Sequence, residues 1–321
     1  MLSRRIYICI VFCLAIMSCE PIEIPVEAIP PGEISQASIN IESDYKYQKH
    51  FSLDQGEVVH EVLKTDWDIA FSTNNDEPYI ILNSSKAMQA ALMVDRSDKV
   101  ETGEVEWSWD TSTGNTDTLA LKEWQLHEGA FLVDRGYDPM GQSIGYVVVV
   151  FEGYEDGVYK FSWNHLDNEE HYSVTIKTNE SVRFKGFSFS SNEEVEIEPE
   201  RSSWDILATQ YLHVFNWEEA SYYLVSGILI NQDRIEVFED EISAFVDINR
   251  EHAEKQSYSR EKDIIGYDWK TYDYDSGFFI IDFEKTFLLK TSEGLYYKLR
   301  FIDFYDENGI KGTPKFEYQK L

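Results

Sequence analysis

The stretch FSLDQGEVVHEVLKTDWDIAF at residues 51–71 decides the fold, because FSFSSNEEVEIEPERSSWDILAT at residues 187–209 repeats its layout. Both stretches contain an aromatic strand, a polar turn, a second strand and then Trp-Asp-Ile. The two tryptophans of this motif, Trp67 and Trp204, are 137 residues apart.

A second match occurs at the same spacing further along the chain. GVYKFSW begins at Gly157 and GLYYKLRF begins at Gly294, again 137 residues later. Two separate matches at one spacing indicate an internal duplication. We therefore expect two homologous β-rich domains in tandem, at residues 41–180 and 181–321.

Each half of the chain has the pattern of β-hairpins. Residues 146–151 form an apolar run that turns into a strand at 158–163, and residues 287–291 turn into a strand at 295–304. One helix is expected near 241–256, where apolar residues fall close to one face. The fold class expected is all-β with a minor helix.

The N-terminus has the layout of an export signal. Two arginines precede an apolar stretch from Ile6 to Met17, which is too short to span a bilayer because about 20 residues are needed. Ser18 then precedes Cys19, so residues 1–18 are predicted to be a lipoprotein signal peptide and Cys19 the lipidated residue. An ordinary cleaved signal or an uncleaved anchor is the alternative.

Residues 19–40 are predicted to be an extended tether. Four of the eight prolines of the chain fall within eleven residues of it. All three cysteines lie at or before Cys19, so the exported part has no disulfide framework. Acidic residues just after Cys19 resemble the surface-export signal of Bacteroidetes lipoproteins. This resemblance implies a lipid-anchored protein of the outer membrane that is exposed at the cell surface.

Composition excludes several classes of partner. The chain carries 59 acidic and 28 basic residues, a formal charge of −31. Such a surface repels nucleic acid and anionic membrane faces. An aromatic content of 15% argues against global disorder.

The sequence contains no recognisable catalytic motif: it has no nucleophile elbow, no zinc-protease motif and no phosphate-binding loop. A glycosidase-like carboxylate pair is possible in so acidic a chain, but no pair stands out. We expect a protein that is not an enzyme.

Three residues are candidates for a ligand site. Tyr211 and His213 share one face of a predicted strand just after the second Trp-Asp-Ile motif. His252 ends the predicted helix, where a histidine also suits the helix terminus. For each of the three a structural role is the alternative. Met88 and Met93 are expected to pack in a core.

The second half of the chain resembles the HmuY family of haem-binding lipoproteins from Bacteroidetes. The motifs that carry the resemblance are SSWDILATQY (202–211), YYLVSGILIN (222–231), IGYDWKTYD (265–273) and YYKLRFIDFYDENGIKGTPKFEY (296–318). The first half matches more loosely, through TDWDIAFSTN (65–74).

The resemblance implies an all-β fold that captures haem at the cell surface for a TonB-dependent outer-membrane receptor. Two side chains hold the iron in this family, so His213 and His252 become the axial candidates and Tyr211 a pocket candidate. Basic groups such as Lys298 or Arg300 would be needed for the haem propionates. The alternative is a non-catalytic surface module on the same fold that binds another ligand or a protein partner.

Overall fold

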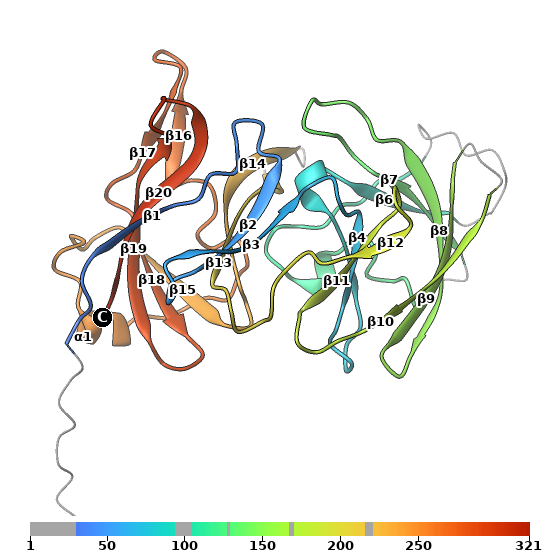
Figure 1. The fold of residues 1–321 in the computed structure, drawn as a ribbon, viewed down its shortest axis with the longest axis horizontal. Helices are drawn as coiled ribbons and strands as arrows, with labels where there is room; N and C mark the ends of the chain where they lie inside the picture. The colour runs from blue at the N-terminus through green and yellow to red at the C-terminus, as the bar shows by residue number, and fades with distance from the viewer. Residues whose placement is uncertain (1–29, 94–104, 127–128, 167–169, 216–220) are drawn as a thin grey trace, which may run out of the picture. The chain divides into compact units, whose positions relative to one another are not determined.

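Antiparallel β-strands are the main regular structure of the described chain, as the hairpin pattern predicts (Figure 1). The computed structural model describes residues 30–93, 105–126, 129–166, 170–215 and 221–321. From Pro31 onward they belong to one compact unit. The predicted signal peptide and Cys19 lie outside the described residues.

The elements of the first part of the chain are β1 (Ser35–Ser38), β2 (Tyr47–Ser52), β3 (Glu57–Leu63), β4 (Ile69–Ser72), β5 (Ile80–Leu82), the 3₁₀ helix η1 (Ser84–Lys86), β6 (Gln89–Met93), the 3₁₀ helix η2 (Thr116–Thr118), β7 (Ala130–Asp134), β8 (Tyr146–Glu155), β9 (Val158–His165) and β10 (Tyr172–Lys177). Those that follow are β11 (Phe184–Ser188), β12 (Glu193–Val195), β13 (Ile206–Phe215), β14 (Ser221–Ile230), β15 (Ile235–Asp240), α1 (Arg250–Glu254), β16 (Lys270–Asp273), β17 (Phe278–Ile281), β18 (Thr286–Thr291), β19 (Tyr296–Tyr305) and β20 (Lys311–Lys320).

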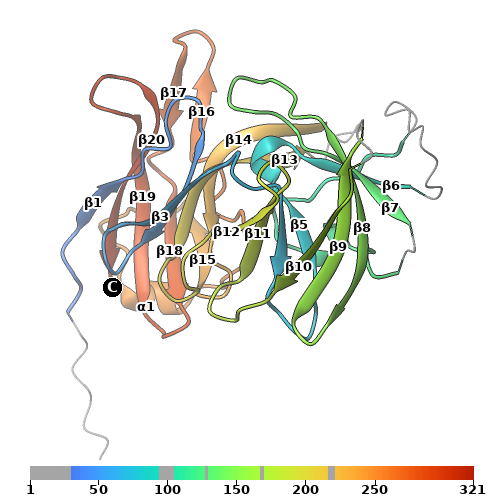
Figure 2. The ribbon, with the colours of Figure 1, turned by 45° about the vertical axis from the view of Figure 1, so that its right-hand side comes forward.

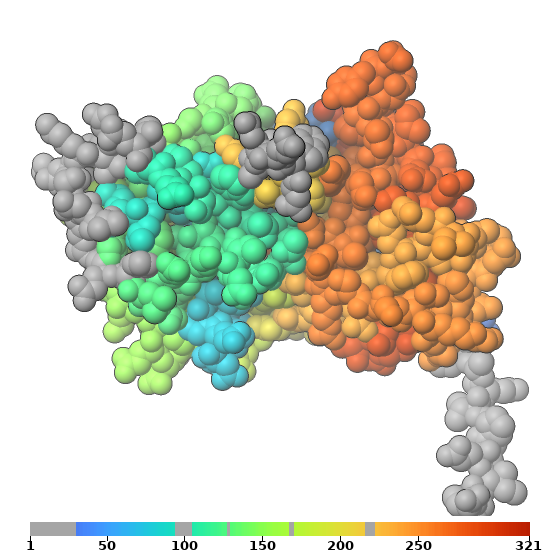
Figure 3. All heavy atoms as spheres, turned by 180° about the vertical axis from the view of Figure 1, so that it is seen from behind, coloured from blue at the N-terminus to red at the C-terminus, as the bar shows by residue number. Residues whose placement is uncertain are grey.

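The described strands form five antiparallel sheets. Their strand orders are β1-β20-β19-β18-β15, β14-β13-β2-β3, β12-β11-β4-β5, β10-β9-β8-β7-β6 and the two-stranded β16-β17. The first four sheets follow one another across the molecule, while β16 and β17 protrude at one end (Figures 1 and 2). From behind, the β16–β17 hairpin is visible as an orange projection (Figure 3).

Both predicted pairs of hairpin strands are confirmed. β8 pairs with β9, and β18 pairs with β19. Along β8, Val147, Val149 and Phe151 are buried and alternate with more accessible residues, as expected for a strand with one face in the core.

The predicted tether ends earlier than residue 40. β1 pairs with β20, and the Gly32 amide donates to the Lys320 carbonyl at 2.8 Å. Ile39 and Ile41 are fully buried. This segment completes the edge of a sheet because its apolar side chains enter the core and its backbone groups find partners on β20.

The helix predicted over 241–256 is wrong over most of its length, because only α1 is helical. The Asp240 carboxylate accepts the backbone amides of Ile242 and Ser243, and this side-chain bonding favours a turn over a helix. Ile242 is 97% exposed, so the apolar face inferred from periodicity does not exist.

Strand pairing crosses residue 180 in three sheets. β2 pairs with β13, β4 pairs with β11, and β1 pairs with β20. The β2–β3 hairpin therefore joins a sheet with strands from the second half, and the β11–β12 hairpin joins one with strands from the first. The division into two homologous domains at residue 180 stays a prediction.

The two Trp-Asp-Ile motifs make corresponding contacts across this crossing. Asp68 accepts the backbone amide of Phe189 at 2.7 Å, and Asp205 accepts that of Leu53 at 2.7 Å. Each aspartate thus binds the FSF or FSL segment that lies in the other half of the chain.

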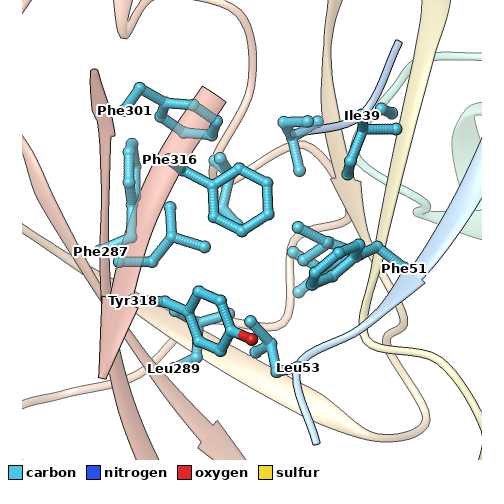
Figure 4. Close-up of a cluster of buried hydrophobic side chains, with 14 of the residues drawn as sticks. Ile39, Phe51, Leu53, Phe287, Leu289, Phe301, Phe316 and Tyr318 are labelled. Atoms are coloured by element: carbon cyan, nitrogen blue, oxygen red, sulfur yellow. The ribbon is translucent and has the colours of Figure 1, made fainter. Parts of the chain in front are cut away.

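Two large cores fill the outer spaces between sheets. One packs the sheet of β18–β20 against β2 and β13, and Figure 4 shows its members Ile39, Phe51, Leu53, Phe287, Leu289, Phe301, Phe316 and Tyr318. The other packs β4, β5 and β11 against the sheet of β8 and β9. Two smaller clusters, around Trp67 and around Trp204, lie between the two middle sheets. Both tryptophans are buried, as expected for core anchors.

Candidate functional site

A pocket of about 750 Å³ lies beside the end of β13 and contains His213 in its wall. Its other walls come from the segment around η2 and from the chain between α1 and β16. It is lined by Thr111, Ser112, Thr113, Gly114, Asn115, Thr118, His213, Val214, Phe215, Gln232, Ser259, Arg260, Glu261 and Asp263. Its volume falls within the range of pockets that hold cofactors.

The His213 ring is held between aromatic side chains and a carboxylate. Its centroid lies 4.9 Å from Phe215 and 5.0 Å from Tyr267, both edge-on. Its Nδ1 atom is 3.8 Å from the Asp263 carboxylate, and the side chain is 27% exposed. Nδ1 is buried without a hydrogen-bond partner among the described residues. At this distance Asp263 acts on the imidazole through its charge and not through a hydrogen bond, and the other ring nitrogen is left for a ligand.

Aromatic residues continue from His213 in both directions along the strand. Tyr211 is 1% exposed, and burial raises the pKa of its hydroxyl well above the ordinary value. Tyr223 pairs opposite His213 on β14 and is exposed. Trp109 and Tyr222 contact each other with tilted rings, their centroids 4.7 Å apart. Tyr211 therefore lies beneath the pocket rather than in its wall.

His252 lies elsewhere. It is on α1, where its Nε2 is 2.7 Å from the Asp240 carboxylate and 3.2 Å from the Gln256 amide. It does not line the pocket that contains His213. The structure thus does not bring the two axial candidates together in one pocket, and their pairing stays a prediction.

The basic residues considered for propionates are already engaged. Lys298 is buried, and its ammonium donates to the carbonyls of Phe245 and Ile248 at 2.6 and 2.9 Å. Arg300 pairs with Glu317 at 2.7 Å. In the pocket wall Arg260 is the cation, with its side chain 63% exposed and 3.4 Å from Glu236.

Three further observations limit the chemistry of the chain. Met88 and Met93 are buried, as expected for core residues. Within the described ranges no group of three or more His, Cys, Asp or Glu side chains could hold a bare metal ion. None of the helices described is long and apolar enough to cross a membrane.

The β16–β17 hairpin carries an exposed apolar patch that the sequence analysis does not identify. Tyr274 is 90% exposed, and Tyr272, Phe278, Ile280 and Phe283 are also exposed. The signal was present in YDYDSGFFII, since a polar turn with so many aromatic residues on both sides has few places to bury them.

Comparison with known proteins decides the family. The family model described as HmuY protein matches residues 44–318. The chain belongs to the HmuY family. Proteins of the HmuY family bind haem at the cell surface as lipoproteins and are not enzymes, which confirms the prediction that the chain has no catalytic role.

Solved structures similar to this member of the HmuY family include three bacterial proteins. Apo PinO from Porphyromonas gingivitis is 8% identical over 90% of this chain and 97% of its own, with a TM-score of 0.30. The apo HmuY analogue of Tannerella forsythia is 12% identical over 91% and 98%, with a TM-score of 0.26. A Bacteroides vulgatus protein described as HmuY-like and haem-binding is 14% identical over 52% and 95%, with a TM-score of 0.25. No curated protein matches the sequence.

Proposed function

We propose that the chain is a surface-anchored lipoprotein that binds haem in the pocket beside β13, with His213 as an axial ligand. The observation that carries the proposal is the His213 imidazole in the wall of a pocket of about 750 Å³, flanked by two aromatic rings. Bound haem would supply an iron centre that takes an imidazole nitrogen.

Asp263 is the carboxylate that lies beside this imidazole, close enough to act on it through its charge. Its carboxylate faces His213 Nδ1 and also accepts the Ser112 hydroxyl at 2.5 Å. A carboxylate in this place favours the tautomer with the proton on Nδ1, so that Nε2 is the ligating atom. Phe215 in the wall supplies a flat apolar surface of the kind that a porphyrin face requires, and Tyr267 packs against Phe215 and His213 without lining the pocket.

His252 supports a ligand role less well. Its Nε2 already contacts the Asp240 carboxylate, and α1 contributes nothing to the wall of this pocket. A second axial ligand is therefore expected from water, from another side chain or from a rearrangement that brings His252 closer.

In the proposed role Cys19 carries the lipid, and the acidic tether holds the β-unit away from the outer membrane. A TonB-dependent receptor would take haem from the pocket. The net charge of −31 makes a nucleic-acid partner unfavourable.

A second function is favoured by one observation, the exposed apolar hairpin β16–β17. An exposed patch of aromatic side chains commonly marks a protein-binding surface. On this reading the chain is a non-catalytic interaction module and the hairpin contacts the partner.

A haem titration separates the two functions. Residues 20–321 with Cys19 removed would be titrated with haemin and followed by absorption spectroscopy. Haem ligation predicts a saturable, sharpened Soret band near one equivalent, which His213→Ala abolishes or shifts. His171→Ala is the matched control, since His171 is exposed and outside the pocket. A spectrum identical to that of free haemin would leave the interaction module as the function.

A further inference from the structure

A second cavity, of about 100 Å³, lies between the two middle sheets at the centre of the molecule. The Trp67 and Trp204 clusters flank it, so both halves of the chain contribute to its wall. It adjoins the pocket beside β13, and four residues border both: Thr111, Ser112, Gly114 and Gln232. Nothing in the proposed haem site uses it.

Hydrogen-bond donors face this cavity without partners. The Trp204 indole Nε1 is buried and makes no hydrogen bond among the described residues, and the same holds for Nδ1 of His50. These residues are only 4% and 2% exposed. The Lys262 ammonium also borders the cavity and forms no hydrogen bond or ion pair in the described part of the chain. Lysine and tryptophan can only donate, so these two donors lack an acceptor among the described residues.

The acidic residues of the wall do not fill this need. Asp110 accepts the backbone amides of Leu82 and Ala120 at 2.7 and 2.8 Å. One oxygen of Glu198 accepts the backbone amides of Arg183 and Phe184. Both carboxylates are therefore held in the wall by the backbone, and neither makes an ion pair with Lys262.

Part of the remaining wall is apolar. It is formed by side chains from β5, β11, β13 and β14 and from the segments beside them, namely Leu82, Phe184, Ile197, Leu207, Leu229 and Trp67. A cavity with donors at one part of its wall and aliphatic and aromatic side chains elsewhere suits a small molecule with an acidic head and an apolar tail. A cavity of about 150 Å³ accepts the six heavy atoms of benzene, so about four or five heavy atoms fit in this smaller cavity.

We propose that this cavity binds a short aliphatic monocarboxylate, with its carboxylate on the Lys262 ammonium and the Trp204 indole N–H. The charge-assisted hydrogen bond from Lys262 would then be made inside the protein, where it is strong. The aliphatic tail would lie against Leu207 and Leu229. The inference does not rest on the haem proposal.

The charged groups around Lys262 give the binding a dependence on pH. Burial, followed by the nearby Arg183, lowers the pKa of Lys262 to about 8. Burial raises the pKa of Asp110 to about 6 and that of Glu198 to about 7, and Lys262 partly opposes both shifts. Asp263 also acts on Lys262 and raises its pKa.

Histidine adds no positive charge to the cavity at neutral pH. Burial, then the charges of His60 and Lys262, keeps the pKa of His50 well below its ordinary value. As the pH rises from 6 to 9, the two acids ionise and Lys262 loses its proton. A carboxylate should therefore bind about tenfold or more weakly at pH 9 than at pH 6.

The test is calorimetric titration of residues 20–321, lacking Cys19, with acetate, propionate and butyrate at pH 6. Propionamide and propylamine serve as neutral and cationic analogues of similar size. The proposal expects saturable binding of propionate near one equivalent, at least about tenfold tighter than of propionamide. Equal affinity for propionate and propionamide, or a preference for propylamine, would overturn the proposal. Failure of every probe to bind would also overturn it, because the cavity would then hold only water.

Two variants locate the binding. Lys262→Met should weaken propionate binding at least about tenfold, while Lys255→Met is the matched control because Lys255 is exposed and lines neither cavity. In the NMR spectrum of the wild-type protein, one indole N–H signal should shift when propionate is added. That signal should be absent from the spectrum of Trp204→Phe, which assigns it to Trp204. Unchanged binding in Lys262→Met, with no shift of the indole signal in the wild type, would contradict the assignment.

Discussion

Asp68 has the most demanding environment of the buried acids. It is fully buried and binds Lys86 at 2.5 Å, Arg135 at 3.1 Å and the amide of Phe189. Burial alone would raise the pKa of its carboxyl, but Lys86 and Arg135 outweigh this effect and hold the pKa below the ordinary value. The first Trp-Asp-Ile motif thus serves as an anchor between distant segments.

Replacing Asp68 should be severe. Asp68→Asn leaves two buried cations without their counter-charge, so we expect a loss of about 3–5 kcal/mol in the free energy of unfolding. Urea denaturation at pH 7 measures it. Glu254→Gln, which breaks an exposed pair with Arg250, should cost less than about 0.5 kcal/mol. A small loss for Asp68→Asn would show that the buried cations find other partners.

Glu198 should give the free energy of unfolding a pH dependence opposite to that from Asp68, because its pKa is raised and not lowered. Burial raises the pKa of its carboxyl to about 7, so the stability that it contributes is present below pH 4.5 and lost as the pH rises through 7. Glu198→Gln should stabilise the protein at pH 8 by about 2–3 kcal/mol and change little at pH 4.5. Thermal or urea unfolding at both pH values measures this difference, with the exposed Glu200→Gln as control. Equal effects at the two pH values would count against a buried, ionising Glu198.

At the scale of elements, the β19–β20 hairpin shows how backbone conformation limits the sequence. Gly309 in its turn has φ 74° and open space around it, whereas Gly312 has φ 104° and lies against the Glu42 carbonyl. The Ile41 amide donates to the Gly312 carbonyl at 2.9 Å, so this contact also fastens the N-terminal segment to β20.

The two glycines make a matched pair for mutagenesis. Gly309→Ala should cost about 1–2 kcal/mol, the price of a left-handed conformation. Gly312→Ala should cost clearly more, because its Cβ would come within 2.2 Å of the Glu42 oxygen. Chemical denaturation of both variants tests the ranking, and a reversed order would contradict the packing of this segment on β20.

In this chain the local sequence pattern predicts where strands lie, but it does not predict the contacts between residues that are distant in sequence. Alternation in residues 146–163 and 287–304 predicts the hairpins, since each strand buries one face against a sequence neighbour. The helix at 241–256 fails because periodicity cannot register the Asp240 side chain that favours a turn. The suggestion that Lys298 binds a propionate fails for a similar reason. Its ammonium is buried against backbone carbonyls about 50 residues away, which local pattern cannot reveal.

The candidate site could be predicted only in part. The position of His213 on a strand follows from sequence, but the pocket beside it is formed by segments about 100 residues earlier and 50 residues later. His252 lies in the same half of the sequence as His213, but it does not line the same pocket. The central cavity was missed because its charged residues are scattered from Asp110 to Lys262.

The whole molecule is held together by strands that cross from one half of the sequence to the other. β2 contributes to a sheet with β13, and β11 to a sheet with β4. The central cavity lies between these two sheets. We therefore expect that neither half is stable alone.

Expression of residues 31–180 and 181–321 as separate chains tests this expectation. Each should lack the cooperative unfolding and dispersed NMR spectrum of the full unit, because edge strands and apolar faces are left without partners. Mixing or co-expressing the two should restore a folded complex. Two independently folded halves would favour separable tandem domains.

The central claim is that the pocket beside β13 binds haem through His213. The most direct measurement is resonance Raman or low-temperature electron paramagnetic resonance of the haemin complex, comparing the wild-type protein with His213→Ala. The account predicts an imidazole-ligated iron in the wild type that is lost in the variant and kept in His171→Ala. Identical iron spectra in all three proteins would contradict it and place the haem, if bound at all, elsewhere on the chain.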